Sequence, residues 1–157
     1  MALEIERKFL VVGDGYRKNS IKSYYVQGYL SSNENRVVRV RIMDNTATLT
    51  IKGKNMGATR LEFEYPIPLS DAEKIISLCE KPLIEKYRYT LTVEGCTWVV
   101  DEFLGENEGL IIAEIELKDE NQTFNKPDWI GKEVTSDPRY YNSNLISSPY
   151  KTWTHKP

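Results

Sequence analysis

Hydrophobic and polar residues alternate along most of this chain, with the period of two that is typical of β-strands. Segment 36–43, for example, places Arg39 and Arg41 on one face and valine and isoleucine residues on the other. Eight segments show this pattern and are predicted to be strands. They are 3–10, 23–30, 36–43, 46–52, 60–67, 84–94, 97–103 and 110–118.

Short connections between these eight strands predict an antiparallel sheet, which protects its edges most simply by closing into a barrel. The remaining segments 12–22 and 121–157 are rich in glycine, asparagine, serine or proline and are expected to form loops and short helical turns. A length of 157 residues fits one domain, spanning 1–157. We therefore expect a mainly β (α+β) fold, an eight-stranded antiparallel closed β-barrel with a few helices outside it.

One longer helix is expected after the fifth strand. Ser70 is a good N-cap and is followed three residues later by Glu73, which is the pattern of a capping box. An apolar stripe at helical spacing then follows, formed by Ala72, Ile75, Ile76 and Cys79.

The charged residues of these strands occur as like-charged pairs two positions apart, and therefore on one face. A pair of this kind, about 7 Å apart at an effective dielectric constant of 20, is repulsive by about 2 kcal/mol. Each strand taken alone fits an ordinary solvated sheet, whose charged face lies in water. Five strands with the same arrangement favour a shared, charged barrel interior. The pairs are Glu4/Glu6, Arg39/Arg41, Glu62/Glu64, Lys86/Arg88 and Glu114/Glu116.

Such an interior would hold an acidic patch beside a basic patch. Carboxylates without histidine or cysteine suit Mg²⁺ or Mn²⁺, which prefer oxygen ligands. Guanidinium and ammonium groups suit phosphate oxygens. The only histidine is His155, near the end of the chain, which excludes histidine-based triads and histidine-rich zinc sites. The pattern indicates a metal-bridged polyphosphate site.

The overall charge balance excludes other classes of protein. The formal net charge is −2, whereas a dedicated nucleic-acid-binding protein would carry a strong basic excess. The N-terminal segment is charged where an export signal would be apolar, and no stretch reaches the length of a membrane span. Cys79 and Cys96 have no metal-binding spacing and fit a reducing compartment. We expect a cytoplasmic protein that binds neither nucleic acid nor membrane.

The N-terminal residues Glu4-Ile5-Glu6-Arg7-Lys8 resemble the ExExK motif of the CYTH superfamily, the triphosphate tunnel metalloenzymes. The similarity covers nearly the whole chain through an ordered series of segments. These segments are 27–30, 39–41, 49–53, 62–64, 85–88, 98–103, 113–117 and 139–144. The resemblance implies an eight-stranded tunnel that binds a triphosphate together with a divalent cation. The compact length and the N-terminal motif resemble the small bacterial members, several of which prefer inorganic tripolyphosphate.

The resemblance also implies roles for the charged residues. Glutamates would bind the metal, with further acidic residues in the same network, and cations would bind the phosphates. The metal-binding residues would be Glu4, Glu6, Glu114 and Glu116, joined by Glu62, Glu64 and Asp101. The phosphate-binding residues would be Lys8, Arg39, Arg41, Lys52, Lys86 and Arg88, with Arg60 in addition.

The expected reaction is metal-dependent hydrolysis of tripolyphosphate to pyrophosphate and phosphate. Because the only histidine lies near the end of the chain, the base is either a metal-activated water or a lysine with a lowered pKa. Arg88 on the same face would lower the pKa of Lys86, which serves either as this base or only as a phosphate clamp. Resemblance to the small triphosphatases adds Tyr29 as the residue that orients Lys86.

Three alternative functions remain open at the level of the sequence. Two of them, an adenylate cyclase and a thiamine triphosphatase, belong to the same superfamily. The third is a non-catalytic module that binds polyphosphate or a nucleotide.

The apolar faces of the strands would point outward from such a barrel, and only one long helix is available to cover them. Extensive exposed apolar surface marks an interface, so we expect a homodimer. The outward residues are Val38, Val40, Leu49, Ile51, Phe63, Ile115 and Leu117.

Overall fold

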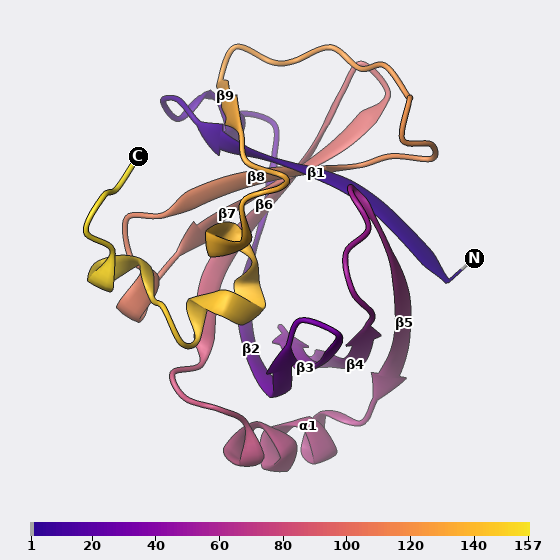
Figure 1. Cartoon of the computed structure of the whole chain (residues 1–157), viewed down its shortest axis with the longest axis vertical. Coiled ribbons are helices and arrows are strands. Elements are labelled where there is room, and N and C mark those ends of the chain that lie inside the picture. Colours follow the sequence, from indigo (N-terminus) through magenta and orange to yellow (C-terminus); the bar gives the residue numbers. More distant parts are fainter. Residues whose placement is uncertain (1) are drawn as a thin grey trace.

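A computed structural model describes residues 2–157 and arranges the strands in one antiparallel sheet (Figure 1). The strands are β1 (Leu3–Val11), β2 (Ile21–Asn33), β3 (Arg36–Met43), β4 (Thr46–Lys52), β5 (Thr59–Ile67), β6 (Ile84–Val93), β7 (Cys96–Phe103), β8 (Ile111–Glu116) and β9 (Ile130–Glu133). Their order is β5-β4-β3-β2-β6-β7-β8-β1-β9, and β1 also pairs with β5. The eight strands β1 to β8 thus form a closed antiparallel barrel, and the predicted fold class is confirmed.

Strand β1 closes the barrel because its two halves pair with different neighbours. Leu3 lies opposite Leu61 on β5, whereas Glu6 lies opposite Glu116 on β8. The end of β1 then pairs with β9, a strand that the sequence did not predict. A strand of four residues is too short to show a period of two.

The pairing of the strands places their charged faces on the inside. Arg88 on β6 lies opposite Asp101 on β7, and Lys8 on β1 lies opposite Glu114 on β8. Because side chains alternate along a strand, these pairs fix the inward direction for every second residue of each strand. The apolar residues that alternate with the inward-facing ones point outward, where other segments of the chain must pack against them to exclude water.

Helix α1 (Leu69–Ile75), continued by the 3-10 turn Ile76–Leu78, covers part of this outer surface below β3 and β4 in Figure 1. Ala72 and Cys79 pack there against Val40 and Ala47. The predicted helix is therefore present, but it is shorter than expected.

The predicted capping box at the start of α1 is wrong. The helix begins at Leu69 with Pro68 as its N-cap, and no side chain caps it. Ser70 consequently lies inside the first turn, two positions beyond the N-cap position from which a hydroxyl could cap the helix.

A second cover lies over β1, β6, β7 and β8 and is formed by the chain that follows β8. Trp129 and Phe124 pack there against Phe9, Trp98 and the outer face of β8. The prediction that the whole outward face is exposed is therefore wrong. Val40 is buried by α1, and Ile115 and Leu117 are buried by this second cover.

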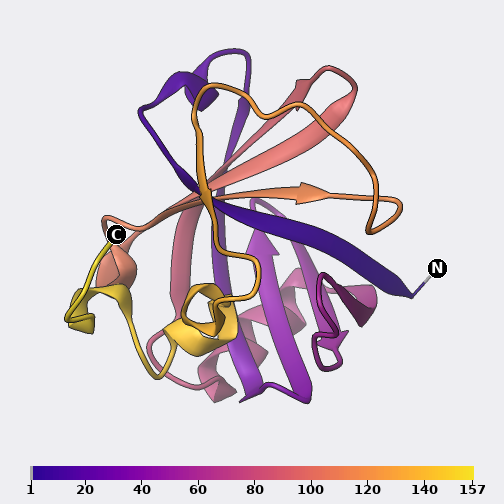
Figure 2. The ribbon, with the colours of Figure 1, turned by 45° about the horizontal axis from the view of Figure 1, so that its top comes forward.

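The C-terminal chain closes one end of the barrel. Tyr140, Leu145 and Trp153 pack against Ile84 and Phe103, which point inward at this end. The C-terminal chain forms short 3-10 turns rather than strands, namely Pro138–Tyr140, Asn142–Leu145 and Tyr150–Thr152. Figure 2 shows this yellow coil beside the barrel, outside the sheet. None of the helices in residues 2–157 has the length and apolar character needed to cross a membrane.

Candidate active site

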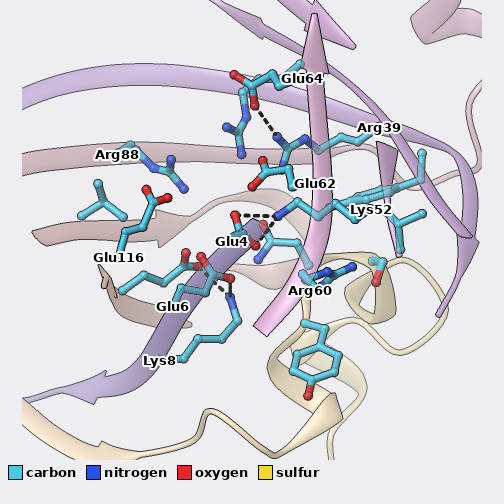
Figure 3. A pocket seen from close by; sticks show the side chains of 18 of the residues that line it. Glu4, Glu6, Lys8, Arg39, Lys52, Arg60, Glu62, Glu64, Arg88 and Glu116 are labelled. Carbon is cyan, nitrogen blue, oxygen red and sulfur yellow. Dashed lines mark hydrogen bonds and ion pairs between the residues drawn. The ribbon is translucent and has the colours of Figure 1, made fainter. Parts of the chain in front are cut away.

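The interior of the barrel contains a cavity of about 540 Å³ that is lined mainly by charged side chains (Figure 3). All the site residues expected from the sequence line this cavity except Asp101. The lining includes Lys8, Tyr29, Arg39, Arg41, Lys52, Arg60, Lys86 and Arg88, together with Glu4, Glu6, Glu62, Glu64, Glu114 and Glu116. Strand β7 contributes Thr97 and Val99, so all eight strands of the barrel supply side chains to the lining. The structure therefore brings together side chains that are far apart in the sequence.

The acidic part of the cavity contains two lysines between its carboxylates. The Nζ atom of Lys8 lies 2.8 Å from Oε1 of Glu114 and 3.3 Å from Oε1 of Glu6. Lys52 donates from Nζ to Oε1 of Glu4 at 3.1 Å (Figure 3). The separation of the two signs of charge, inferred from the sequence, is thus incomplete in this part of the cavity.

The electrostatic balance differs among these carboxylates. Burial raises the pKa of Glu4, and Lys52 offsets only part of this effect. Burial also tends to raise the pKa of Glu6, but the charges of Lys8 and Lys52 and a hydrogen bond with Glu114 together outweigh it, and the pKa is lowered. The pKa of Glu116 is raised by burial and by the negative charges of Glu4 and Glu6. Negative charge around Glu116 is therefore not fully compensated by the protein.

The basic part of the cavity contains guanidinium groups with few carboxylate partners. Arg39 is buried, and its Nη2 donates to Oγ1 of Thr50 at 3.1 Å and lies 3.7 Å from Oε2 of Glu64. Its Nε has no hydrogen-bond partner in the part of the chain that the structure describes. A buried donor without a partner is costly unless a ligand provides an acceptor.

Arg41 lies beside Arg39 and is held by neutral groups. Its Nε donates to Oε1 of Gln27 at 2.9 Å. The ring of Tyr25 lies 4.8 Å from the guanidinium carbons of both Arg41 and Arg88. Burial and the positive charges of Arg39 and Arg88 lower the pKa of Arg41 to about 9. This surplus of positive charge is complementary to an anion.

Asp101 lies behind the cavity wall, and both of its carboxylate oxygens contact cationic side chains. Arg88 donates to it from Nε at 2.7 Å and from Nη2 at 2.9 Å, and the Nζ atom of Lys86 lies 2.8 Å from Oδ2. Burial alone would raise the pKa of Asp101, but Arg88 and Lys86 lower it to about 2. The structure therefore places Asp101 with the cations and apart from the carboxylates that line the cavity.

Lys86 is almost completely buried at the boundary between the cavity and the core. Its Nζ donates to Oδ1 of Asn142 at 2.8 Å, in addition to its ion pair with Asp101. Burial lowers its pKa well below the ordinary value for lysine. The charge of Asp101 raises the pKa, whereas the charges of Arg88 and Arg41 lower it further. The lowered pKa inferred from Arg88 is present, with burial as its main cause.

Tyr29 does not bind Lys86 directly in the described chain. The Tyr29 hydroxyl accepts a hydrogen bond from Nε2 of Gln27 at 3.3 Å, and the same Nε2 lies 3.0 Å from Oδ1 of Asn142. The expected orientation of Lys86 by Tyr29 is thus replaced by a contact through Gln27 and Asn142. A hydrogen-bond network of this kind depends on the position of a distant segment, which strand periodicity does not report.

Several residues of the site were given no role by sequence reasoning. They are Gln27, Thr50, Tyr141, Asn142 and Ser143. Gln27 carries a weak signal, because it is an amide on the same strand face as two tyrosines. Segment 139–144 belongs to the resemblance described above, but its composition indicates no particular chemistry.

The carboxylates do not form a ready-made metal site in residues 2–157, where no three His, Cys, Asp or Glu side chains are grouped to hold an ion. Instead, Lys8 and Lys52 bind the carboxylates. The donors nevertheless fit Mg²⁺ or Mn²⁺ chemically, because they are all carboxylate oxygens. A divalent cation would also relieve the repulsion that raises the pKa values of Glu4 and Glu116.

Known proteins resemble this chain over nearly its whole length. The model of the CYTH domain family matches residues 2–146. An inorganic triphosphatase of Acetivibrio thermocellus is 56% identical over 154 residues, which cover 98% of this chain and 99% of that protein. An inorganic triphosphatase of Nitrosomonas europaea is 33% identical over 150 residues, which cover 92% of this chain and 97% of that protein.

The fold of a solved structure supports the same relationship. The crystal structure of an inorganic triphosphatase matches this one with a TM-score of 0.66 and 32% sequence identity, over 92% of this chain and 97% of the other. The family model covers every residue that lines the cavity. The chain belongs to the CYTH domain family.

Proposed function

We propose that this protein is a divalent-metal-dependent inorganic triphosphatase that hydrolyses tripolyphosphate to pyrophosphate and phosphate inside the barrel. The observation that carries the proposal is a cavity inside the barrel that has a surplus of positive charge around Arg41 and a surplus of carboxylate oxygens around Glu116. The two relatives named as inorganic triphosphatases support it, because each matches more than nine-tenths of this chain.

Phosphate binding is assigned to the basic part of the cavity. Arg39 offers an unused buried donor, and Arg41 is bound only through a neutral amide oxygen and an aromatic ring. Guanidinium groups bind phosphate oxygens in bidentate fashion, so these two and Arg88 form the main clamp. Lys8, Lys52 and Arg60 would contact the remaining phosphate oxygens.

Metal binding is assigned to Glu4, Glu6, Glu114 and Glu116, with Glu62 and Glu64 in the same acidic surroundings. Metal dependence is general among the triphosphatases of this family. Mg²⁺ and Mn²⁺ are the ions that suit an all-carboxylate site. A divalent cation bound there would neutralise phosphate charge and lower the pKa of a coordinated water. Asp101 is assigned instead to holding Lys86 and Arg88 in place.

Lys86 is the residue best suited to accept a proton from the attacking water. Phosphoanhydride cleavage depends mainly on positioning and on neutralising charge, and a base with a lowered pKa assists the nucleophile. The pKa of Lys86 is lowered because the side chain is buried among Arg88 and Arg41. Tyr29 would act beside it through the Gln27 amide.

The test is to measure phosphate release from tripolyphosphate, ATP and thiamine triphosphate, each with Mg²⁺, with Mn²⁺ and with a chelator. The proposal predicts the highest kcat/KM for tripolyphosphate, equal yields of pyrophosphate and phosphate, and no turnover with the chelator. Tight binding of tripolyphosphate without turnover in any metal would identify a binding module. Cyclic AMP as the main product from ATP would identify a cyclase, and preference for thiamine triphosphate would change the substrate.

We also propose that the protein forms a homodimer through an apolar strip on the outer faces of β4, β5 and the start of β1. Strand pairing places Ile51 opposite Phe63 and Leu3 opposite Leu61, with Tyr65 further along β5. All five side chains are exposed. A second copy of this chain could bury the strip by presenting the same surface.

A further inference from the structure

Asn142 reaches the barrel interior from outside the sheet. It begins the 3-10 turn Asn142–Leu145, which follows all nine strands in the sequence. Leu145 at the end of this turn is fully buried in the hydrophobic cluster that closes the barrel. Tyr141, Asn142 and Ser143 line the cavity next to the charged residues of the strands. The turn is therefore anchored by its apolar end and presents polar side chains to the site.

A single oxygen of Asn142 joins two groups of the active site. Its Oδ1 accepts hydrogen bonds from Nζ of Lys86 at 2.8 Å and from Nε2 of Gln27 at 3.0 Å. Two donors converge on this atom, which defines the orientation of the Asn142 amide. Gln27 is itself fully buried, and its Oε1 accepts from Nε of Arg41 at 2.9 Å. One chain of amides thus links Lys86 to a guanidinium of the phosphate clamp.

Lys86 needs such a contact because its other partner is shared. Asp101 already accepts two hydrogen bonds from Arg88, and Lys86 pairs with one of the same oxygens. Four charged groups act on the pKa of Lys86 besides its burial: Asp101 and Glu114 raise it, whereas Arg88 and Arg41 lower it. Asn142 is the neutral acceptor among its neighbours. A lysine side chain is flexible, so loss of this acceptor would leave Nζ held from one side only, by the Asp101 oxygen that it shares with Arg88.

We propose that Asn142 is a positioning residue of the triphosphatase reaction, whose Oδ1 holds the Lys86 amine where it meets the attacking water. Gln27 sets the orientation of the Asn142 amide and couples it to Arg41. This inference rests on the proposed function, because it concerns the placement of Lys86 in that reaction. It gives the C-terminal turn a part in turnover as well as in the closure of the barrel.

The experiment is a double-mutant cycle of Asn142→Ala and Lys86→Ala, read as kcat and KM for tripolyphosphate with Mg²⁺ or Mn²⁺. Asn142→Ala should lower kcat by about tenfold to a hundredfold, which is the range for a misplaced catalytic group. KM should change by less than about threefold, because the clamp arginines remain. The double variant should be no slower than Lys86→Ala alone, because Asn142 acts through Lys86.

Asn144→Ala provides the matched control in the same turn. Asn144 donates from Nδ2 to the backbone carbonyl of Pro138 and is not among the residues that line the cavity. The control should keep the kcat and KM of the wild type even if its melting temperature falls. Melting temperature and tripolyphosphate binding, measured for every variant, show that each one is folded with an intact clamp.

Three results would overturn the inference. They are a wild-type kcat for Asn142→Ala, an equal loss of kcat in Asn144→Ala, and fully multiplicative losses in the double variant. The first of these results, if it came with a raised KM, would show that Asn142 binds substrate directly. Each of these results leaves the wild type active on tripolyphosphate, whereas an inactive wild type would overturn the proposed function itself.

Discussion

Buried charges in this barrel fall into two groups that should respond differently to substitution. Asp101 is surrounded by cations, which lower its pKa to about 2. The pKa of Glu116 is raised by burial and by the neighbouring carboxylates of Glu4, Glu6 and Glu114, against a smaller effect of Lys52. Removing the negative charge of Asp101 leaves buried cations unpaired, whereas removing that of Glu116 relieves repulsion. We therefore expect Asp101 to stabilise the fold and Glu116 to reduce the stability of the metal-free protein.

Asp101→Asn should destabilise the protein by about 3–5 kcal/mol at neutral pH, because Arg88 and Lys86 lose their shared counter-ion. The folded-state pKa of about 2 lies below the ordinary value of 3.8, so the stability from Asp101 is complete above about pH 4 and is lost as the pH falls toward 2. Urea unfolding at several pH values measures this free energy, and substitution of the exposed Glu108 as Glu108→Gln is the control. Equal stability of Asp101→Asn and wild type at pH 7 would contradict the assignment.

Substitutions of Lys86 and Arg41 should affect different kinetic constants, kcat for Lys86 and KM for Arg41. Lys86→Ala should lower kcat about a hundredfold or more, the range for loss of a general base. Arg41→Ala should instead raise KM by roughly tenfold to a hundredfold, the equivalent of one or two hydrogen bonds to a charged group. Steady-state kinetics with tripolyphosphate measure both. A Lys86→Ala variant with unchanged kcat and a raised KM would make Lys86 a phosphate clamp and not a base.

Among the structural elements, β2 shows why a small residue is required within the segment shared with the family. A Cβ atom on Gly28 would lie 2.7 Å from Cβ of Cys79 and 3.0 Å from Cδ2 of Leu83. Strand β2 therefore packs directly against the chain that follows α1. The same strand carries Gln27 and Tyr29 inward, so this contact also fixes one wall of the cavity.

Gly28→Ala should destabilise the protein by about 1–3 kcal/mol, because the added methyl group must displace Cys79 or the strand. Gly53→Ala is the matched control, since its Cβ would meet Cβ of Leu61 at an ordinary 3.5 Å. Thermal or urea unfolding of both variants gives the comparison. The packing argument fails if the two substitutions have the same effect.

The eight strands of the barrel could be predicted because each follows a period of two over at least six residues. Their charged faces, and with them most of the site, followed from the same alternation. Strand β9 was missed because it has four residues, and the start of α1 was misplaced because Pro68 determines it. Local pattern is informative only where it extends over several residues.

The contacts between side chains of different strands could not be predicted in the same way. The ion pairs of Lys8 and Lys52 with carboxylates depend on which strands are neighbours and in what register. The roles of Gln27 and Asn142 depend on a C-terminal turn that folds back over the end of the barrel. These features arise from tertiary packing, which no single segment encodes.

The whole molecule is covered unevenly on its outside. Helix α1 and the chain after β8 bury the outward faces of most strands, whereas Ile51, Phe63 and Tyr65 stay exposed on β4 and β5. The exposed region that the sequence predicted is therefore confined to one strip. This strip lies on the outer face of strands whose inner face carries Lys52, Glu62 and Glu64.

We expect a dimer at micromolar concentration, and we expect Phe63→Glu to convert it to a monomer because it places a charge in the apolar strip. Phe63 points away from the cavity, so the kcat of the variant should match that of the wild type. Analytical ultracentrifugation and light scattering measure the change. A wild type that is monomeric at these concentrations would contradict the proposed interface.

The central claim is that the carboxylates inside the barrel hold the metal that activates triphosphate hydrolysis. Its most direct test is the melting temperature of wild type and Glu116→Gln, each with and without Mn²⁺, alongside their activities. Metal at a hundredfold its Kd should stabilise the wild type by about 2.7 kcal/mol. Glu116→Gln should lose activity and most of this metal shift, yet melt no lower than the wild type without metal. The claim would be contradicted by intact activity in Glu116→Gln, or by a wild-type melting temperature that does not change when Mn²⁺ is added.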